Sequence, residues 1–266
     1  MARLLGLLIV LFGMNTGFVM LDSAVAQNGE AHVLAPGGTL RVGVVLAPQA
    51  GVFFVATDAA GVPHGVTVDL AKALGRHLGV PVAFSVFPNS GECTDSVAKG
   101  EVDVAFMPVD PARSARVTFG PGYYVLESTY LVSGVSGITS LAGVDRAGVR
   151  VVGIADTTTI RAAARSLSHT QPIASRGVDE AIAMIRDGRA DALALSRDSL
   201  NQILPTVPGA LIVDGGFQQT TVSIAVPPGR PAAAAAARAW MDAAKHDGTV
   251  RRAFDALGLT HEAVAP

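Results

Sequence analysis

Residues 100–132 of the chain read GEVDVAFMPVDPARSARVTFGPGYYVLESTYLV, and they carry most of the information about the fold. A short apolar run ends at Met107, a Pro-Val-Asp-Pro loop follows, and Arg113 stands where a short helix would begin. An arginine just beyond the end of a parallel strand points into the crevice where open α/β sheets bind their ligands. Because the planar guanidinium matches a carboxylate or a phosphate, this stretch predicts an anion-binding position at Arg113.

Strand and helix patterns alternate on both sides of this stretch. Short β-branched apolar runs are followed by runs with apolar residues at helical spacing, an order typical of a parallel sheet with helices on its faces. The pattern restarts at residue 149, which predicts two α/β units with a cleft between them. The predicted strands are 39–45, 81–86, 102–107, 149–154, 191–195 and 221–226, and the predicted helices are 69–78, 94–99, 157–167, 178–186 and 231–247.

The composition excludes several classes of protein. The chain has 266 residues, of which 50% are hydrophobic and 16% charged, so it can bury a sizeable core and is not disordered over most of its length. A net charge of −2 provides no basic face for phosphates, which excludes nucleic acid as a partner. The single cysteine, Cys93, excludes an internal disulfide. The 6 histidines lack metal-ligand spacing, so we expect no metal and no cofactor.

The first 26 residues have the pattern of a secretory signal peptide. Arg3 precedes an apolar run over residues 4–20, and Ala24-Val25-Ala26 is a small-x-small cleavage site. We therefore expect cleavage after Ala26, a periplasmic mature protein and a flexible leader over residues 27–38. The alternative is an uncleaved membrane anchor, whereas a lipid anchor is excluded because no cysteine lies near the cleavage site.

The sequence contains no complete motif for bond-breaking chemistry. Ser96-Val97-Ala98-Lys99 matches the S-x-x-K pattern of serine acylases, but the partner motifs of that chemistry are missing. Cys93 has Glu92 and Asp95 as neighbours, whose charges raise the pKa of a thiol and make it a poor nucleophile. We therefore assign no catalytic residue and expect that the protein is not an enzyme.

Seven short motifs follow one another in an order that resembles a known family. Inside residues 100–124, Gly-x-Val-Asp is followed by an apolar strand, Pro-x-Arg, Val-x-Phe and Pro-x-Tyr-Tyr. The whole set spans residues 38–260 and is similar to the type 2 periplasmic solute-binding proteins of amino-acid-type ABC transporters (bacterial extracellular solute-binding protein family 3). The other six motifs are GVTVDL at 65–70, ITSLAGV at 138–144, VGIADTTT at 152–159, GRADA at 188–192, SIAV at 223–226 and DGT at 247–249.

The resemblance implies a two-lobed α/β fold in which each lobe is a mostly parallel sheet flanked by helices. Lobe 1 would comprise residues 39–127 and 222–262, and lobe 2 residues 128–221, with crossover strands near 127–132 and 221–226. Members of this family bind a small molecule in the cleft, close on it and deliver it to an ABC permease in the inner membrane. We therefore expect a monomeric substrate-binding component of an importer.

The resemblance also implies which residues bind the ligand. Arg113 matches the family's arginine that holds the α-carboxylate of the ligand. Thr158 and Thr159 match threonines at a helix N-terminus that bind the same group, although a pure helix-capping role is the alternative for both. Phe53 or Phe54 falls where the family places an aromatic wall against the ligand.

Two departures from the family's pattern change the expected ligand. Ser196, with Arg197 beside it, replaces the aspartate that binds the α-amino group, and Pro108 stands where a serine or threonine commonly donates. Our hypothesis is that Arg113 and Arg197 face the cleft from opposite lobes. They would hold an anionic solute without a free amino group, such as a dicarboxylate or an aromatic acid.

Three alternatives remain open at this stage. In the first, Arg197 is a surface residue paired with Asp198 or Asp191. In the second, the protein is a non-transport periplasmic interaction protein of the same fold. In the third, it is a cyclohexadienyl-dehydratase-like enzyme, which would need an acid or base in the cleft with an activating partner that the sequence does not reveal. The candidates for that group are Glu127, Asp110 and Asp156.

Overall fold

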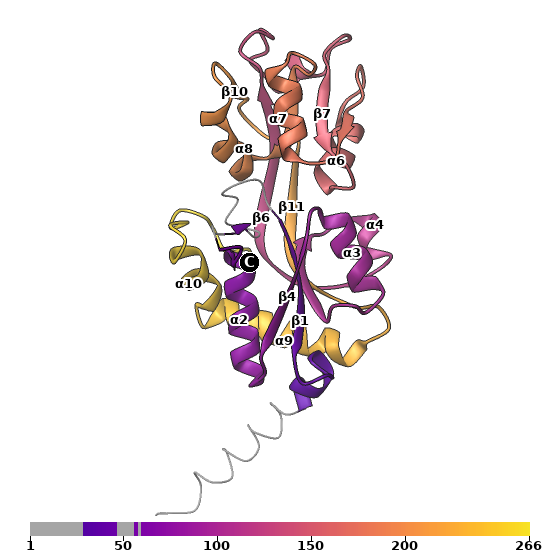
Figure 1. The fold of residues 1–266 in the computed structure, drawn as a ribbon, viewed down its shortest axis with the longest axis vertical. Coiled ribbons are helices and arrows are strands. Elements are labelled where there is room, and N and C mark those ends of the chain that lie inside the picture. Colours follow the sequence, from indigo (N-terminus) through magenta and orange to yellow (C-terminus); the bar gives the residue numbers. More distant parts are fainter. Residues whose placement is uncertain (1–28, 47–55, 58–59) are drawn as a thin grey trace, which may run out of the picture.

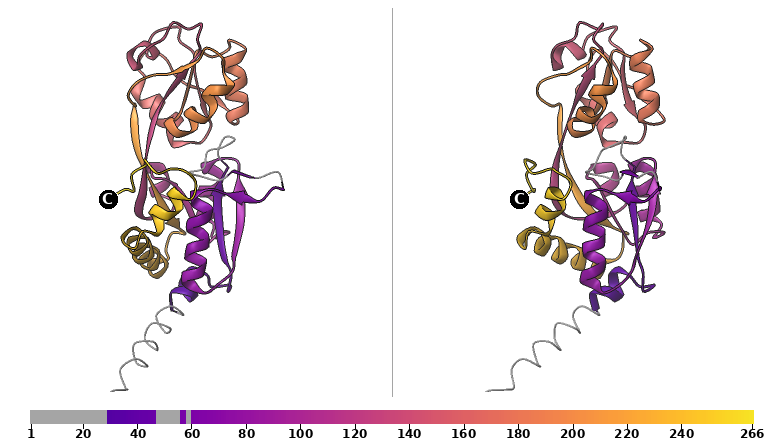
Figure 2. Two further views of the ribbon diagram at one scale, coloured as in Figure 1. Left: turned by 90° about the vertical axis from the view of Figure 1, so that its left-hand side faces the viewer. Right: turned by 60° about the vertical axis from the view of Figure 1, so that its left-hand side comes forward.

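A computed structural model describes residues 29–46, 56–57 and 60–266, and it has two lobes stacked along the long axis of the molecule (Figure 1). One mixed sheet runs through both lobes, with the strand order β4-β1-β5-β11-β6-β9-β7-β8 and with β10 paired to β6. Helices flank the sheet in each lobe (Figure 2), so the predicted two-lobed α/β fold is confirmed. The predicted signal peptide lies outside the described residues.

The element boundaries are as follows. The strands are β1 (Leu40–Val45), β2 (Ala56–Thr57), β3 (Pro63–His64), β4 (Val82–Phe87), β5 (Val104–Pro108), β6 (Thr118–Val132), β7 (Val151–Ile154), β8 (Ile173–Ser175), β9 (Ala192–Ser196), β10 (Leu211–Ile212) and β11 (Gln218–Val226). The helices are α2 (Val66–Leu78), α3 (Ser90–Ala98), α4 (Pro111–Ser114), α5 (Leu141–Val144), α6 (Thr158–Ser166), α7 (Val178–Arg186), α8 (Arg197–Ile203), α9 (Pro231–His246) and α10 (Thr249–Asp255), with a 3-10 turn at Leu204–Thr206. None of these helices is long and apolar enough to span a membrane.

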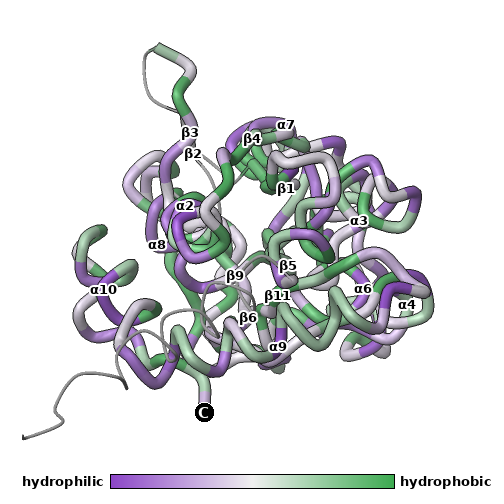
Figure 3. The backbone as a smooth tube through the Cα atoms, turned by 90° about the horizontal axis from the view of Figure 1, so that it is seen from below, coloured by the Kyte–Doolittle hydropathy of each residue, from purple (hydrophilic) through white to green (hydrophobic). Residues whose placement is uncertain are grey.

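Lobe 1 is built on β1, whose sequence LRVGVV is buried at every position except Arg41. β1 pairs in parallel with β4 on one side and β5 on the other, which places Val42 opposite both Phe84 and Val104. A parallel strand covered on both faces needs a nearly continuous apolar run, which residues 42–45 provide after Arg41. In Figure 3 the residues of β1 are coloured mainly as hydrophobic, whereas α2 and α4 also carry hydrophilic residues.

Tyr123 of β6 lies inside the core of lobe 1, where it packs between a strand from the first half of the chain and a helix near the C-terminus. Its buried ring meets Phe106 of β5 edge-on, with 5.9 Å between the ring centroids, and Phe254 of α10 at 6.5 Å. Trp240 and Met241 of α9 belong to the same core. The C-terminal helices are therefore part of lobe 1 together with the N-terminal strands.

Part of the predicted flexible leader also belongs to this core. Residues 29–34 are helical, and Leu34 and Ala35 are buried against lobe 1. Arg230 holds the segment from outside because its Nη2 donates to the carbonyl oxygen of Val33. The prediction of a flexible leader is wrong for this segment, since its two apolar side chains fill a place in the core that local composition does not reveal.

The strands β6 and β11 connect the lobes. β6 has 15 residues; its first part pairs antiparallel with β11 and its last part with β9, and the two pairings meet at Ser128. The strands approach closely at Gly122, where a Cβ atom would come within 2.0 Å of Cγ2 of Thr221, so a side chain there would force the strands apart. Every other link between the lobes is non-covalent within residues 60–266.

Lobe 2 repeats the plan of lobe 1 around β7. This strand pairs in parallel with β8 and β9, which places Val152 opposite Ile173 and Leu193. Side chains of α7 and α8 form a core on one face of the sheet, and those of α5 and α6 form another on the opposite face. The carboxyl ends of β7 and β9 consequently meet those of β1 and β5 between the lobes.

Candidate functional site

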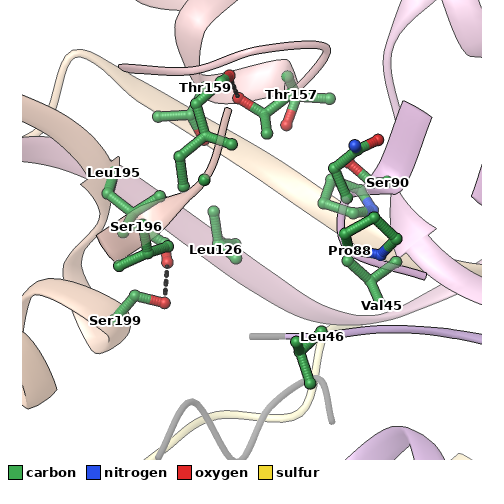
Figure 4. Close-up of a pocket in the computed structure, with 16 residues that line it drawn as sticks. Val45, Leu46, Pro88, Ser90, Leu126, Thr157, Thr159, Leu195, Ser196 and Ser199 are labelled. Carbon is green, nitrogen blue, oxygen red and sulfur yellow. Dashed lines mark hydrogen bonds between the residues drawn. The ribbon is translucent and has the colours of Figure 1, made fainter. Parts of the chain in front are cut away.

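A cavity of about 80 Å³ lies between the lobes (Figure 4). Its lining includes the last residues of four strands: Val45 of β1, Pro108 of β5, Ile154 of β7 and Ser196 of β9. The carboxyl ends of parallel strands are where open α/β sheets bind ligands. Both lobes therefore bring their binding edges to the same place.

The cavity wall has an apolar part and a hydroxyl-bearing part. The described apolar side chains include Leu126 of β6, between the lobes, and Leu195 from lobe 2. In Figure 4, Ser90 lies across the cavity from Ser196, and Thr159 lies at the end of α6. A ligand that fits both parts has a small polar head and an apolar body.

The N-terminus of α6 provides donors for an anionic head. Thr157 is the N-cap: its Oγ1 accepts a hydrogen bond from the N–H of Ile160 at 3.2 Å and donates to the carbonyl of Ile154 at 2.8 Å. The first amides of a helix have no partner inside it. This leaves the amides of Thr158 and Thr159, which line the cavity, without an acceptor among the described residues. The capping role falls to Thr157, so the two threonines expected at the site are available to a ligand.

Arg113 lies behind the cavity wall. Its side chain is 3% exposed; Nη1 donates to the carbonyl of Pro108 at 2.9 Å, and Nη2 donates to Oγ of Ser90 and to the carbonyl of Asp156 at 3.2 Å. Burial lowers the pKa of Arg113 to about 10, while the carboxylate of Asp110 opposes that shift. The group is still a cation at neutral pH, and it acts on the cavity through Ser90 and Pro108.

Ser90 connects the positive charge of Arg113 to the cavity. Its Oγ accepts a hydrogen bond from Arg113, and its side chain lines the cavity. A hydroxyl that accepts from a cation has its own proton left to donate. Ser90 can therefore donate to a ligand oxygen, and the guanidinium strengthens that donor.

Arg197 does not line the cavity, contrary to the hypothesis that it faces the cleft. Its Nε donates to Oε2 of Glu127, and its Nη2 donates to the carbonyl of Gly215 at 2.8 Å. Glu127 follows Leu126 on β6, and successive side chains of a strand point to opposite faces. Since Leu126 lines the cavity, Glu127 and its arginine lie on the other face of β6. The alternative partners are wrong as well, because Asp191 pairs with Arg150 at 2.6 Å and the ion pair of Arg197 is with Glu127 rather than with Asp198.

Ser196 is in the cavity wall, as expected. Its Oγ donates to Oγ of Ser199 at 2.9 Å, a bond drawn in Figure 4. The pair offers neutral hydroxyls and no carboxylate at this corner. Phe53 and Phe54, expected as an aromatic wall, lie outside the described residues.

The described lining of the cavity contains no titratable side chain. Among the candidates for a catalytic acid or base, Glu127 is paired on the opposite face of β6, and Asp110 is paired with Arg161. Burial by itself would raise the pKa of Asp110, but hydrogen bonds from Arg161 and from the amide of Arg113 hold it below its usual range. In the described part of the chain there is also no cluster of three or more histidine, cysteine, aspartate or glutamate residues that could hold a metal ion.

Sequence reasoning missed Ser90, Ser199 and Arg161. Ser90 opens a helix whose first turn, SGEC, has no apolar stripe, so the prediction began that helix at residue 94. A usable signal was present: Asn89 caps the helix by accepting from the amide of Glu92 at 2.9 Å, and asparagine is a favoured N-cap. Ser90 then follows the carboxyl end of a parallel strand, the position from which the site is built.

Two lobes joined by two strands, with a cavity between their carboxyl edges, define a solute-binding protein of the type 2 periplasmic kind. Residues 44–257 match the model of the bacterial extracellular solute-binding proteins, family 3. The chain belongs to this family. No protein of curated function matches the sequence significantly.

Solved structures share the fold over most of the chain. One is an ancestral amino-acid-binding protein described as a precursor of cyclohexadienyl dehydratase, with 26% identity, a TM-score of 0.73, and coverage of 84% of this chain and 97% of that one. Another is a solute receptor for L-cysteine of Neisseria gonorrhoeae, with 22% identity, a TM-score of 0.75, and coverage of 86% and 93%. A binding component of an ABC transporter from Wolinella succinogenes, complexed with lysine, has 21% identity, a TM-score of 0.72, and coverage of 82% and 94%.

Proposed function

We propose that this chain is the substrate-binding component of a bacterial ABC importer and that its cleft takes a compact carboxylic acid without an ammonium group. The observation that carries the proposal is the wall of the cavity. It combines free donors at the N-terminus of α6 with apolar side chains, and its described residues include no carboxylate.

The carboxylate of the ligand would lie at the N-terminus of α6. The amides of Thr158 and Thr159 and the hydroxyl of Ser90 are hydrogen-bond donors without another acceptor, which supports a carboxylate as the head group. A helix N-terminus carries a partial positive charge that favours an anion. Arg113 adds a full charge behind Ser90, so the site attracts a carboxylate more strongly than its neutral amide.

The remainder of the ligand would be short and apolar. A cavity of about 80 Å³ is smaller than the engineered cavity of about 150 Å³ that holds benzene. Leu126 and Leu195 favour a branched aliphatic body over a polar one. A dicarboxylate, one of the expected ligands, loses support because Arg197 is paired with Glu127 on the other face of β6.

An α-ammonium group lacks a partner in this wall. Ser196 and Ser199 occupy the corner where the resemblance implies an aspartate, and hydroxyls do not balance a positive charge. Structural relatives described with lysine or L-cysteine as ligands are amino-acid binders. We infer that this chain shares their fold and differs from them in the charge of the ligand.

The described lining of the cavity supports binding of a solute rather than catalysis. Dehydration of a cyclohexadienyl compound needs a positioned acid or base. The described lining offers none, and Asp110 lies outside the cavity in an ion pair with Arg161. The similarity to an ancestral precursor of such an enzyme is therefore read as a similarity of fold and of solute binding.

A thermal-shift panel on the chain from Gln27 onward tests the ligand class. The panel contains linear and branched acids of three to six carbons, the corresponding amides, and the corresponding α-amino acids. A ligand at 100 times its Kd adds about 2.7 kcal/mol, which corresponds to roughly 5–10 °C in Tm for a chain of this size. We expect shifts with acids and none with amides. Shifts with amino acids would overturn the ligand class, and no shift at all would favour the interaction protein.

Export and the transport partner are parts of the same proposal. Cleavage after Ala26 predicts a mature N-terminus at Gln27, which the intact mass of the protein from a periplasmic extract would test. A monomer is expected by light scattering. Recruitment of an inner-membrane permease would be measured as ligand-stimulated ATP hydrolysis in proteoliposomes that contain a candidate ABC importer from the same organism. An unstimulated rate would contradict the transport role.

A further inference from the structure

Three contacts join the lobes beside the cavity, at the ends of α3, α4 and α6. Asp110 is the N-cap of α4 in lobe 1, and its Oδ2 pairs with Nη2 of Arg161 on α6 of lobe 2. Arg113 of α4 donates to the carbonyl of Asp156, the second contact. The third is the close approach of Gly91 of α3 to Asp156, which leaves no room for a side chain at residue 91. None of these side chains lines the cavity.

The two partners of the ion pair differ, because Asp110 is buried and held by its own lobe, whereas Arg161 is more exposed. Asp110 is 5% exposed and is held in place by the amide of Arg113, which donates to its Oδ1 at 2.9 Å. The side chain of Arg161 is 33% exposed and approaches from the other lobe. A carboxylate that its own lobe already holds in place loses little side-chain entropy when a cation arrives. The pair therefore favours the arrangement in which the lobes are together.

The contact at Gly91 is close enough to exclude a side chain. A Cβ atom at Gly91 would lie 2.7 Å from Cβ of Asp156, and Asp156 has a left-handed backbone with φ of 58°. This is the one non-glycine residue with a positive φ in the described part of the chain. An L-residue in that conformation is strained unless its surroundings hold it, and here the carbonyl of Asp156 accepts from Arg113 of the other lobe.

We propose that Asp110 and Arg161 form a latch between the lobes, with Gly91 and Asp156 as its close-packed contact, and that this latch sets the affinity of the cleft from outside it. The closed arrangement gains stability from contacts between protein groups alone. A ligand that binds the closed arrangement has an apparent Kd equal to its intrinsic Kd divided by the closed fraction. Weakening the latch consequently weakens binding of every cleft ligand by one common factor.

The test is a distance measurement between the lobes without any ligand. Spin labels are placed on cysteines introduced at two exposed positions, Lys99→Cys in lobe 1 and Ser168→Cys in lobe 2. Cys93 is buried and stays unlabelled. Pulsed electron paramagnetic resonance then gives the distance distribution for the parent and for Arg161→Ala. Arg165→Ala is the matched control, because Arg165 is exposed in the last turn of the same helix.

Arg161→Ala is expected to shift the distribution to longer distances, Arg161→Lys to restore part of the parent distribution, and Arg165→Ala to leave it unchanged. Gly91→Ala is the second variant and decides alone if Arg161→Ala fails to fold. Its methyl group would lie 2.7 Å from Cβ of Asp156 and so keeps the lobes apart; it would also lie 3.1 Å from Oδ1 of Asn89, so circular dichroism of the variant is measured alongside. Unchanged circular dichroism together with a longer distance between the labels would show that the variant folds while its lobes stay apart.

An Arg161→Ala distribution that overlaps the parent, in a variant with unchanged circular dichroism, would overturn the latch. If Arg161→Ala does not fold, an unshifted Gly91→Ala distribution would do so. Because no ligand is present, these outcomes are independent of the proposed ligand class. A failed thermal-shift panel would leave the latch standing, and a failed latch would leave the panel standing.

Discussion

The two faces of β6 assign opposite roles to two arginines that sequence analysis had paired. Arg113 acts on the cavity, which Leu126 lines, through Ser90, whereas Arg197 is paired with Glu127 on the other face. Leu126 and Glu127 are adjacent, so a single step along the strand separates a binding position from an outward-facing ion pair. The comparison shows that a charge near a cleft reaches the cavity only if a residue of the wall, here Ser90, connects the two.

Arg113→Ala is expected to have the largest effect of these substitutions, and it acts on the stability of the protein. The substitution leaves Asp110 with one cation fewer and leaves the carbonyl of Pro108 without its donor. A buried polar group left without its partner costs roughly 1–3 kcal/mol of unfolding free energy, and the carbonyls of Pro108 and Asp156 both lose their donor. The midpoint of urea denaturation measures this loss. Arg113→Lys is the control, because it keeps the charge without the fork, and we expect it to recover only part of the stability.

Ser90→Ala is expected to have the next largest effect, and it acts on binding. It removes the hydroxyl between Arg113 and the cavity while leaving the backbone of α3 intact. A hydrogen bond to a charged group contributes about 1.5–3 kcal/mol, so affinity for an acid that binds the parent should fall roughly 10- to 150-fold. Isothermal titration measures the change. Ser199→Ala is the matched control on the other side of the cavity, and an equal loss there would contradict the position assigned to the carboxylate.

Asp198→Asn tests the residue next to Arg197 in the first turn of α8. The carboxyl group of Asp198 is buried, and burial raises its pKa, although hydrogen bonds from the Ser196 hydroxyl and the Ser199 amide oppose that shift. A carboxyl whose pKa is higher in the folded state binds more protons when folded. The free energy of unfolding of the protein therefore falls as pH rises above about 3.9, the pKa of the group in the unfolded chain.

For this variant, thermal or urea unfolding should be measured from pH 3 to pH 8. The asparagine variant should match the parent near pH 3 and be more stable than the parent at pH 8, because only the parent must ionise a buried carboxyl group as pH rises. A difference that is independent of pH would show that Asp198 is ionised in the folded protein and would contradict the buried environment described here.

Arg197→Ala is expected to have the smallest effect. Arg197 and Glu127 are 32% and 34% exposed, and ion pairs at that exposure contribute about 0.2–1 kcal/mol. Affinity for a cleft ligand should stay within about threefold of the parent. A double-mutant cycle with Glu127→Gln measures the coupling. A loss of affinity comparable with that of Ser90→Ala would place Arg197 in the cleft after all.

The fold was readable from the sequence because its signals are local. The apolar run at residues 102–107 became β5, and the pattern of a proline-bounded loop before Arg113 became the cap and first turn of α4. The threonines at residues 157–159 open α6 as predicted, although the capping residue is Thr157 alone. Strand and helix patterns repeat with the periods of their own backbones, and no distant contact is needed to see them.

The site was only partly readable because its decisive contacts are long-range. Asp110 and Arg161 are 51 residues apart, and Arg197 and Glu127 are 70 apart, so neither pair leaves a pattern in the sequence. The face on which Arg197 lies depends on where β9 ends and α8 begins, and the boundary falls between Ser196 and Arg197. A boundary prediction is rarely accurate to one residue, and here one residue decides the role.

The most direct test of the central claim compares two ligands that differ by one group. Valine is 3-methylbutanoate with an α-ammonium in place of one hydrogen, so the pair isolates the ammonium while shape and carboxylate stay nearly constant. Isothermal titration of each into the chain from Gln27 onward should give binding of the acid and at least tenfold weaker binding of valine. Tighter binding of valine would contradict a cleft that lacks a partner for the ammonium and would return this chain to the amino-acid binders.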